Sequence, residues 1–103
     1  MSNKFRIEYL PAAEKDLINI FEYILSDNPS TATNFLDQVN ESILKLEDFP
    51  YMGVIPKDSR LKYLGYRILI VENYLVFYVV YEVEELVEIR RVLHGKRQYN
   101  FLF

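Results

Sequence analysis

The chain of 103 residues has no cysteine, no tryptophan and a single histidine. Without cysteine it has no disulfide framework, no cysteine-ligated zinc site and no thiol nucleophile. Glycine and proline are also scarce, with three and four copies, which argues against a disordered chain. We therefore expect a globular protein that uses neither a metal nor a cofactor.

Long apolar runs are missing as well. No stretch approaches the length of a transmembrane helix, and the first residues lack the uninterrupted apolar segment of a secretion signal. We expect a cytoplasmic protein with no membrane contact. At 12.3 kDa and 50% hydrophobic residues, residues 1–103 have room for one domain with one core.

Acidic residues are missing from the end of the chain. Residues 1–59 carry five Lys or Arg against ten acids, whereas residues 60–103 carry seven against five. No acid follows Glu88, and the acid-free end holds four cations, which are Arg90, Arg91, Lys96 and Arg97. The sequence pI near 5.1 argues against non-specific DNA binding driven by overall charge. Any contact with a phosphate backbone or an acidic partner must therefore be local to this end.

Three β-branched and aromatic runs in the last third predict an antiparallel meander, because the breaks between them are too short for a parallel crossover. These runs are residues 66–71, 74–83 and 86–93. Residues 4–9 alternate polar with apolar side chains and predict one earlier strand, with its apolar side chains facing the core.

Two amphipathic helices are predicted between that strand and the meander. Pro11 opens the first, which should end near Asp27, and Asn28 with Pro29 opens the second, which Pro50 stops. Their apolar stripes are Ala13, Leu17, Ile20, Phe21 and Ile24, and Ala32, Phe35, Leu36, Val39, Ile43 and Leu46.

Only a few residues join the two helices, so they should lie antiparallel and bury both stripes against the sheet. The predicted fold is an α+β, two-layer β-α-α-β-β-β domain, with a helical hairpin packed on an antiparallel sheet. Residues 51–65, which include Gly53, Pro56 and Gly65, are predicted to form a surface loop.

The order of these elements and the sequence of the meander resemble those of the toxins of the RelE/ParE superfamily. The matching segments are GYRILIVENYLVFY at residues 65–78 and RRVLHGKR at residues 90–97. The resemblance covers nearly the whole chain and implies a growth-inhibiting toxin of a type II toxin–antitoxin pair. It also implies a cognate antitoxin that holds the toxin inactive, as a dimer or a toxin–antitoxin heterotetramer.

Two branches of this superfamily act differently. RelE-like members cleave mRNA in the ribosome, whereas ParE-like members bind DNA gyrase and trap it on cut DNA. A metal-free nuclease of the first kind needs several cations around the scissile phosphate and a group that activates the 2′-hydroxyl. In that branch Arg67, Lys96 and Arg97 fit basic positions, and His94, Arg97 and Tyr99 are the candidate catalytic residues.

Other positions of the chain depart from the nuclease pattern. Leu69 and Leu75 stand where that pattern has basic residues, and Phe103 stands near its tyrosine position. Residues 73–78 and 91–95 are instead similar in sequence to ParE-like members. The resemblance therefore favours gyrase as the target, with ribosome-dependent mRNA cleavage as the alternative.

The candidate target-binding residues are Arg67, Arg90, Arg91, Lys96 and Arg97. Strand alternation places Val87, Ile89 and Leu93 on one face and Glu88, Arg90 and His94 on the other. Arg91 then falls on the apolar face, unless a bulge re-aims it or a carboxylate such as Glu82 or Glu88 pairs with it. Arg90 has an equally good interpretation as a solvated cation.

His94 is the single histidine, a residue type that would suit a general acid or base, but a lone histidine at a strand end is more often a structural hydrogen-bonder. A third hypothesis from another class is a small adaptor domain whose sheet edge binds a peptide. It leaves the acid-free basic end unexplained.

Overall fold

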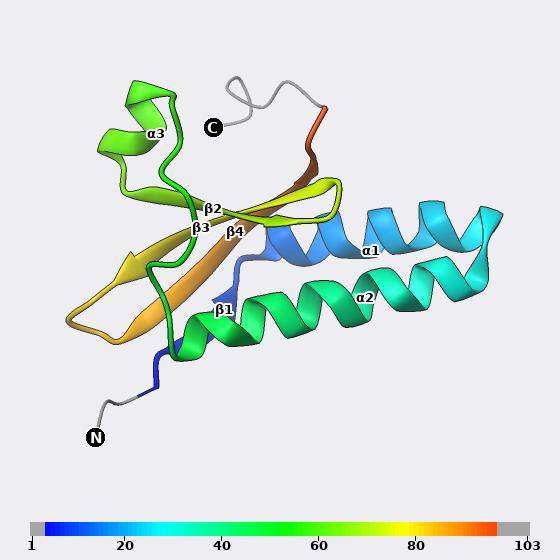
Figure 1. Cartoon of the computed structure of the whole chain (residues 1–103), viewed down its shortest axis with the longest axis horizontal. Coiled ribbons are helices and arrows are strands. Elements are labelled where there is room, and N and C mark those ends of the chain that lie inside the picture. Colours follow the sequence, from blue (N-terminus) through cyan, green and yellow to red (C-terminus); the bar gives the residue numbers. More distant parts are fainter. Residues whose placement is uncertain (1–3, 97–103) are drawn as a thin grey trace.

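Two long helices pack on one face of a four-stranded sheet in the computed structural model, which describes residues 4–96 (Figure 1). The predicted α+β class and the predicted order of the main elements are confirmed. In chain order the elements are β1 (Arg6–Tyr9), α1 (Pro11–Asp27), α2 (Pro29–Leu44), a 3-10 turn η1 (Lys45–Glu47), α3 (Ser59–Tyr63), β2 (Tyr66–Val71), β3 (Tyr74–Tyr81) and β4 (Leu86–His94).

The junction between α1 and α2 follows the sequence signals closely. Asn28 has an extended backbone, with φ −151° and ψ 104°, and this breaks the helix after Asp27. Its side-chain oxygen accepts hydrogen bonds from the Thr31 N–H at 3.2 Å and from the Ser30 hydroxyl at 2.9 Å. The first of these bonds satisfies a backbone donor that the first turn of α2 leaves open, while Pro29 has no N–H to satisfy.

The strands lie in the order β1-β4-β3-β2. β2, β3 and β4 form the predicted antiparallel meander, but β1 pairs in parallel with β4, so that Ile7 lies opposite Val87. The sheet is therefore mixed, where a wholly antiparallel sheet was expected. The two helices give the chain the long connection that parallel neighbours require.

The inner face of the sheet and the helices enclose the main core. Both helical stripes reach it, because Ala13, Phe35, Val39 and Ile43 are buried there. The sheet supplies Leu69, Val71, Val76, Tyr78, Val87, Ile89 and Val92 to the same cluster. Phe5, Ile7 and Tyr9 pack against it from the β1 end, as the alternation predicted.

The outer face of the sheet carries a second, smaller apolar cluster that the sequence did not indicate. Leu61 of α3 is fully buried against it. The Asp58 side chain begins α3 by accepting a hydrogen bond from the Leu61 N–H at 3.0 Å. Residues 51–65, expected to be a loop, thus contain a short helix that covers part of the outer face. The other buried members are Tyr66, Ile68, Phe77, Val79 and Leu93.

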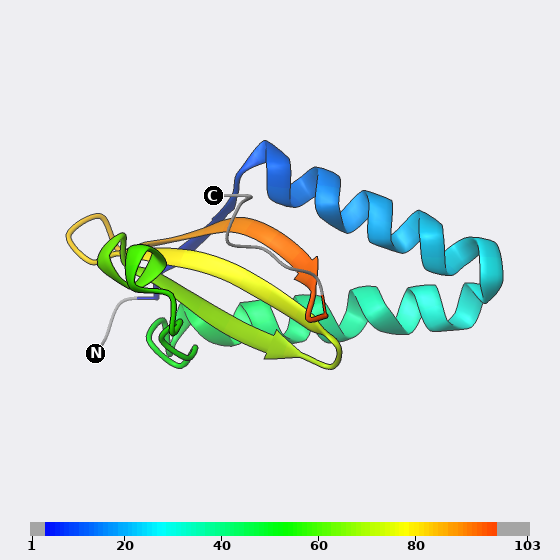
Figure 2. The same ribbon diagram turned by 90° about the horizontal axis from the view of Figure 1, so that it is seen from above.

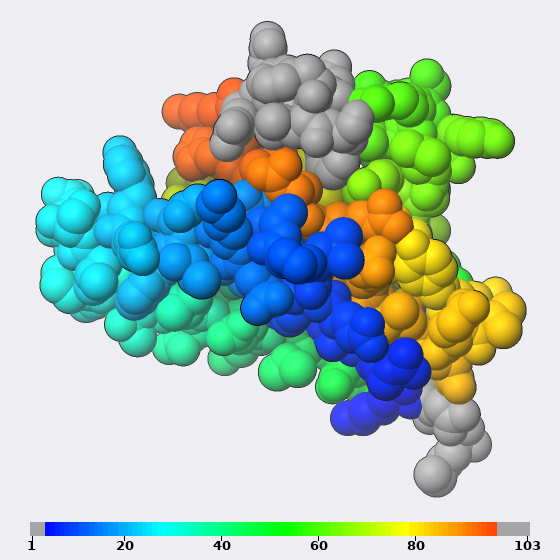
Figure 3. Space-filling view, turned by 180° about the vertical axis from the view of Figure 1, so that it is seen from behind, coloured from blue at the N-terminus to red at the C-terminus, as the bar shows by residue number. Residues whose placement is uncertain are grey.

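The helical hairpin extends past the sheet, so the α1–α2 junction projects beyond the strands (Figure 2). Seen from behind, β1 and α1 lie beside β4 (Figure 3). Within residues 4–96, no helix is long and apolar enough to cross a membrane.

Candidate functional site

A β-bulge in β4 decides which way the basic residues of the last strand point. Ile89 lies opposite Tyr78 and Arg91 lies opposite Phe77, so Arg90 is one extra residue between two paired positions. Such a bulge shifts the alternation of side chains by one. Val92 therefore joins Val87 and Ile89 in the inner core, and Leu93 joins the outer cluster. The prediction that Leu93 shares a face with Val87 was wrong, because strict alternation does not survive the bulge.

Arg90 lies on the outer face inside a polar cluster made by the sheet itself. Its guanidinium donates to Glu88 at 2.9 Å, to the Tyr81 hydroxyl at 2.5 Å and to the Tyr66 hydroxyl at 3.2 Å, and it lies 5.3 Å from the centre of the Tyr66 ring. Burial works to lower the pKa of Arg90, but Tyr66 and Tyr81 outweigh it and the pKa is raised. Arg90 is thus a partly buried cation held by three side chains of its own sheet.

Arg91 is paired with a residue that the sequence did not single out. Its guanidinium makes two parallel hydrogen bonds to the Asp16 carboxylate of α1, at 2.7 and 2.9 Å, and this partner raises the pKa of Arg91. The same carboxylate accepts the Val92 N–H at 2.9 Å. Both alternatives for Arg91 hold together, since a bulge re-aims it and a carboxylate binds it. The carboxylate comes from α1 and not from Glu82 or Glu88.

Arg67 fastens the segment after α2 to the sheet. It donates to the Tyr51 and Gly53 carbonyl oxygens, both at 3.0 Å, and its guanidinium lies 5.1 Å from the centre of the Tyr51 ring. Beside it, the buried Tyr78 hydroxyl accepts the Gly53 N–H at 2.9 Å. A Cβ at residue 53 would lie 2.5 Å from that hydroxyl, so only glycine fits.

His94 and Lys96 are exposed at the end of β4. The Lys96 N–H donates to His94 Nδ1 at 3.1 Å. The His94 ring packs edge-on against Tyr74 at 5.4 Å between centres. Gly95 donates its N–H to the Asn73 carbonyl at 2.7 Å, which fixes the strand end against the β2–β3 turn. Arg97 and Tyr99 lie outside the described residues.

The two leucines at nuclease positions differ in their surroundings. Leu69 is 6% exposed and belongs to the inner core, whereas Leu75 is partly buried against the outer cluster. A cation at residue 69 would be buried among apolar side chains of the helices and could not reach a phosphate.

Short helix α3 adds cations that the sequence reasoning did not connect with the site. Arg60 and Lys62 lie on α3, which covers the outer face, and both are exposed. The signal was present in Asp58 as a cap before a short apolar and basic run, but a helix of five residues is too short for a visible period. In the part of the chain that the structure describes, no group of three or more His, Asp or Glu side chains is placed to hold a metal ion.

Residues 7–99 match the model of the family described as the ParE toxin of the type II toxin–antitoxin system parDE. The chain belongs to the ParE toxin family. The suspected RelE/ParE resemblance is therefore confirmed, and the chain is a toxin of a type II toxin–antitoxin system. Among curated proteins, none matches its sequence.

Two solved structures of toxin–antitoxin systems share the fold of the toxin. A chain of the chromosomal ParDE system from P. aeruginosa aligns with a TM-score of 0.74 and 17% identity, covering 92% of this chain and 100% of that one. A chain of the toxin–antitoxin complex RelBE2 from Mycobacterium tuberculosis aligns with a TM-score of 0.61 and 18% identity, covering 88% and 98%. At these identities the likeness concerns the fold, which ParE-like and RelE-like chains have in common.

Proposed function

We propose that this ParE-family toxin arrests growth by binding DNA gyrase, and that a cognate antitoxin neutralises it. The family assignment favours gyrase, since the matching model describes ParE toxins. The two solved systems, described as ParDE and as a toxin–antitoxin complex, support an antitoxin partner for this chain.

The observation that carries the choice of target is the burial of Leu69 in the inner core. A metal-free nuclease must surround the scissile phosphate with cations, and loss of one such group costs about a hundredfold in rate. Leu69 faces the helices, and Arg67, Arg90 and Arg91 are each bound to groups of the toxin itself. These arginines support the shape of the sheet, which leaves Lys96 and Arg97 as the residues proposed to contact the target.

Ribosome-dependent mRNA cleavage is the second candidate, and His94 is the observation that favours it. The imidazole is exposed, and its Nδ1 accepts the N–H of Lys96, where the basic segment begins. In this second mechanism Nε2, which is not used in that bond, would exchange a proton with a ribose hydroxyl. Within residues 4–96, Arg67, Arg90 and Arg91 are each bound to groups of the toxin, which speaks against their assisting it.

One pair of assays separates the two candidates. Purified toxin is added to supercoiling reactions with gyrase, and in parallel to a translating extract in which mRNA is followed by primer extension. We expect loss of supercoiling with cleaved DNA held by gyrase, and intact mRNA. Codon-phased cuts in the mRNA with supercoiling unchanged would reverse the choice.

The antitoxin is tested by growth. Expression of the toxin alone should stop bacterial growth, and co-expression of a small protein encoded beside it should restore growth. A folded toxin that leaves several hosts unaffected would contradict the proposal.

A further inference from the structure

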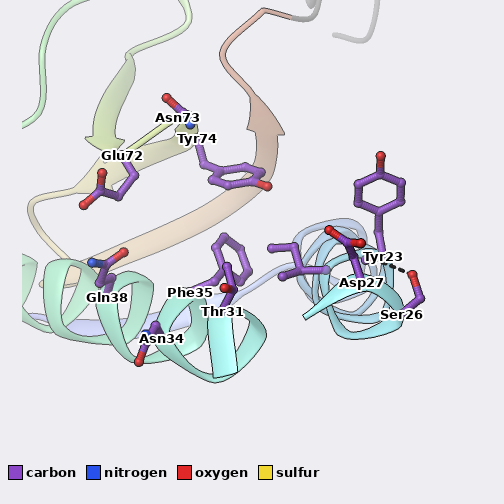
Figure 4. Close-up of a pocket in the computed structure, with 11 residues that line it drawn as sticks. Tyr23, Ser26, Asp27, Thr31, Asn34, Phe35, Gln38, Glu72, Asn73 and Tyr74 are labelled. Carbon is purple, nitrogen blue, oxygen red and sulfur yellow. Dashed lines mark hydrogen bonds between the residues drawn. The ribbon is translucent and has the colours of Figure 1, made fainter. Parts of the chain in front are cut away.

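A cavity of about 850 Å³ lies between the projecting end of the helical hairpin and the turn that joins β2 to β3 (Figure 4). Asp27 at the end of α1 lies on one side of it, and Glu72 of the turn lies on the other. In this view the rings of Phe35 and Tyr74 lie between them, and Tyr23 lines the cavity on the far side of Asp27. The basic end of β4 does not contribute to this cavity.

The aromatic lining is built into the fold. Phe35 is 6% exposed and packs edge-on against Tyr74 at 4.8 Å between ring centres. Burial raises the pKa of the Tyr74 hydroxyl, and the neighbouring Tyr23 raises it further. Tyr23 itself is 80% exposed, which leaves one face of the cavity open to an incoming group.

The charges around the cavity have one sign. Among residues 4–96, its lining includes the carboxylates of Asp27 and Glu72 and no lysine or arginine. The helical layer behind it, residues 11–47, carries seven acids against two lysines. Aromatic faces together with carboxylates attract a cation, the first through the ring quadrupole and the second through charge. An acidic or phosphate-bearing ligand would meet repulsion here.

We propose that this cavity receives an arginine or lysine side chain of the antitoxin, with its stem against Tyr23 and Tyr74 and its charge between Asp27 and Glu72. The inference rests on the proposed antitoxin partner. The carboxylates of Asp27 and Glu72 favour a basic group by charge complementarity. The cavity is large enough for a long side chain with its hydration water. An antitoxin that also covers Lys96 then needs acidic residues at one end of its contact and a basic residue at the other.

Two measurements on toxin made in a cell-free system test the proposal. In the first, ¹⁵N-labelled toxin is titrated at low salt with the peptide Ac-Ala-Arg-Ala-Ala-Arg-Ala-NH2, and with the same peptide carrying glutamate for arginine. The arginine peptide should shift the amide signals of Glu72 and Tyr74, and Asp27→Asn with Glu72→Gln should weaken its binding about tenfold. Equal shifts from both peptides, or none from the arginine peptide, would overturn the assignment.

In the second measurement, the affinity of the double variant for the small protein encoded beside the toxin is compared with that of a matched variant, Glu14→Gln with Glu41→Gln. These control carboxylates are exposed on the same helices and do not line the cavity. The double variant should lose about tenfold in antitoxin affinity, less at high salt, and keep its action on gyrase. If antitoxin affinity is unchanged, the proposal is wrong, and if gyrase inhibition is lost at the same time, the cavity is a contact for gyrase. The peptide titration and the affinity for the protein encoded beside the toxin are both binding measurements, so absence of toxicity would not affect them.

Discussion

Asp16 of α1 and Arg91 of β4 form a bidentate ion pair, with nitrogen–oxygen distances of 2.7 and 2.9 Å, across 75 residues of sequence. The Asp16 carboxylate also accepts the Val92 N–H, just after the bulged Arg90, on the stretch of β4 that β1 does not pair with. One carboxylate thus joins the first helix to the last strand and satisfies an edge donor that β1 leaves open.

This relationship predicts that Asp16→Asn destabilises the fold. The side chains of Asp16 and Arg91 are 12% and 23% exposed, so loss of the charge leaves a partly buried cation without its partner. We expect the free energy of unfolding to fall by about 1–3 kcal/mol. Urea unfolding measures it, with Glu22→Gln on the exposed side of the same helix as the control. A double-mutant cycle with Arg91→Gln should show coupling; additive effects would mean that the pair contributes nothing.

Gly53→Ala tests the contact between the segment after α2 and the sheet. The new Cβ would meet the Tyr78 hydroxyl at 2.5 Å, and we expect a loss of roughly 1–3 kcal/mol from overpacking. Removal of that hydroxyl takes away the shortest contact, while the Tyr78 Cε1 contact at 2.8 Å stays, so Gly53→Ala should cost less, but still something, in a Tyr78→Phe background. Thermal melting of the four proteins measures this, and equal costs in both backgrounds would refute the contact.

Alkaline pH should destabilise the toxin. Burial raises the pKa of Tyr9, Tyr74 and Tyr78, so the folded state keeps their protons to higher pH than the unfolded chain. Stability from these groups is complete below about pH 10 and decreases as pH rises through the folded pKa values. Each group changes the free energy of unfolding by at most about 1.4 kcal/mol per pH unit.

Urea unfolding between pH 8 and 11 measures this slope. Tyr78→Phe should reduce it, whereas Tyr63→Phe, which removes a hydroxyl that is 89% exposed with its ring, should not. A stability that rises with pH in this range would contradict the assignment of buried, protonated tyrosines.

Toxicity should depend most on Arg97, with Lys96 in support. Arg97→Ala should change the free energy of unfolding by no more than about half a kcal/mol, because replacing a charge that takes no part in the core has little effect on stability. The same change should raise the concentration that inhibits gyrase by about tenfold, which corresponds to about 1.4 kcal/mol. Lys15→Ala, on the acidic helical layer, is the control. A folded Arg97→Ala protein with full inhibition would remove this residue from the contact with the target.

Local signals in the sequence were sufficient for most of the fold. The Asn28 cap and Pro29 set the boundary between the helices, and the short polar breaks set the meander, because capping and turn chemistry act within a few residues. The stripes that include Phe35 and Val39 identified the buried faces of the helices for the same reason. The sequence of residues 65–78 and 90–97 indicated the family before any contact was known.

Tertiary structure alone decided what the cations do. Arg91 finds Asp16, and Arg67 finds the carbonyl oxygen of Gly53, because folding brings together groups that are far apart in sequence. The bulge at Arg90 has no local signature, since it follows from the fit of β4 against β3 and α1, yet it reverses the faces of Leu93 and His94. The parallel pairing of β1 with β4 likewise joins strands that are far apart in the sequence, so local signals do not specify it. A sequence pattern records which side chains avoid water, whereas a partner for a charge exists only once distant elements have packed.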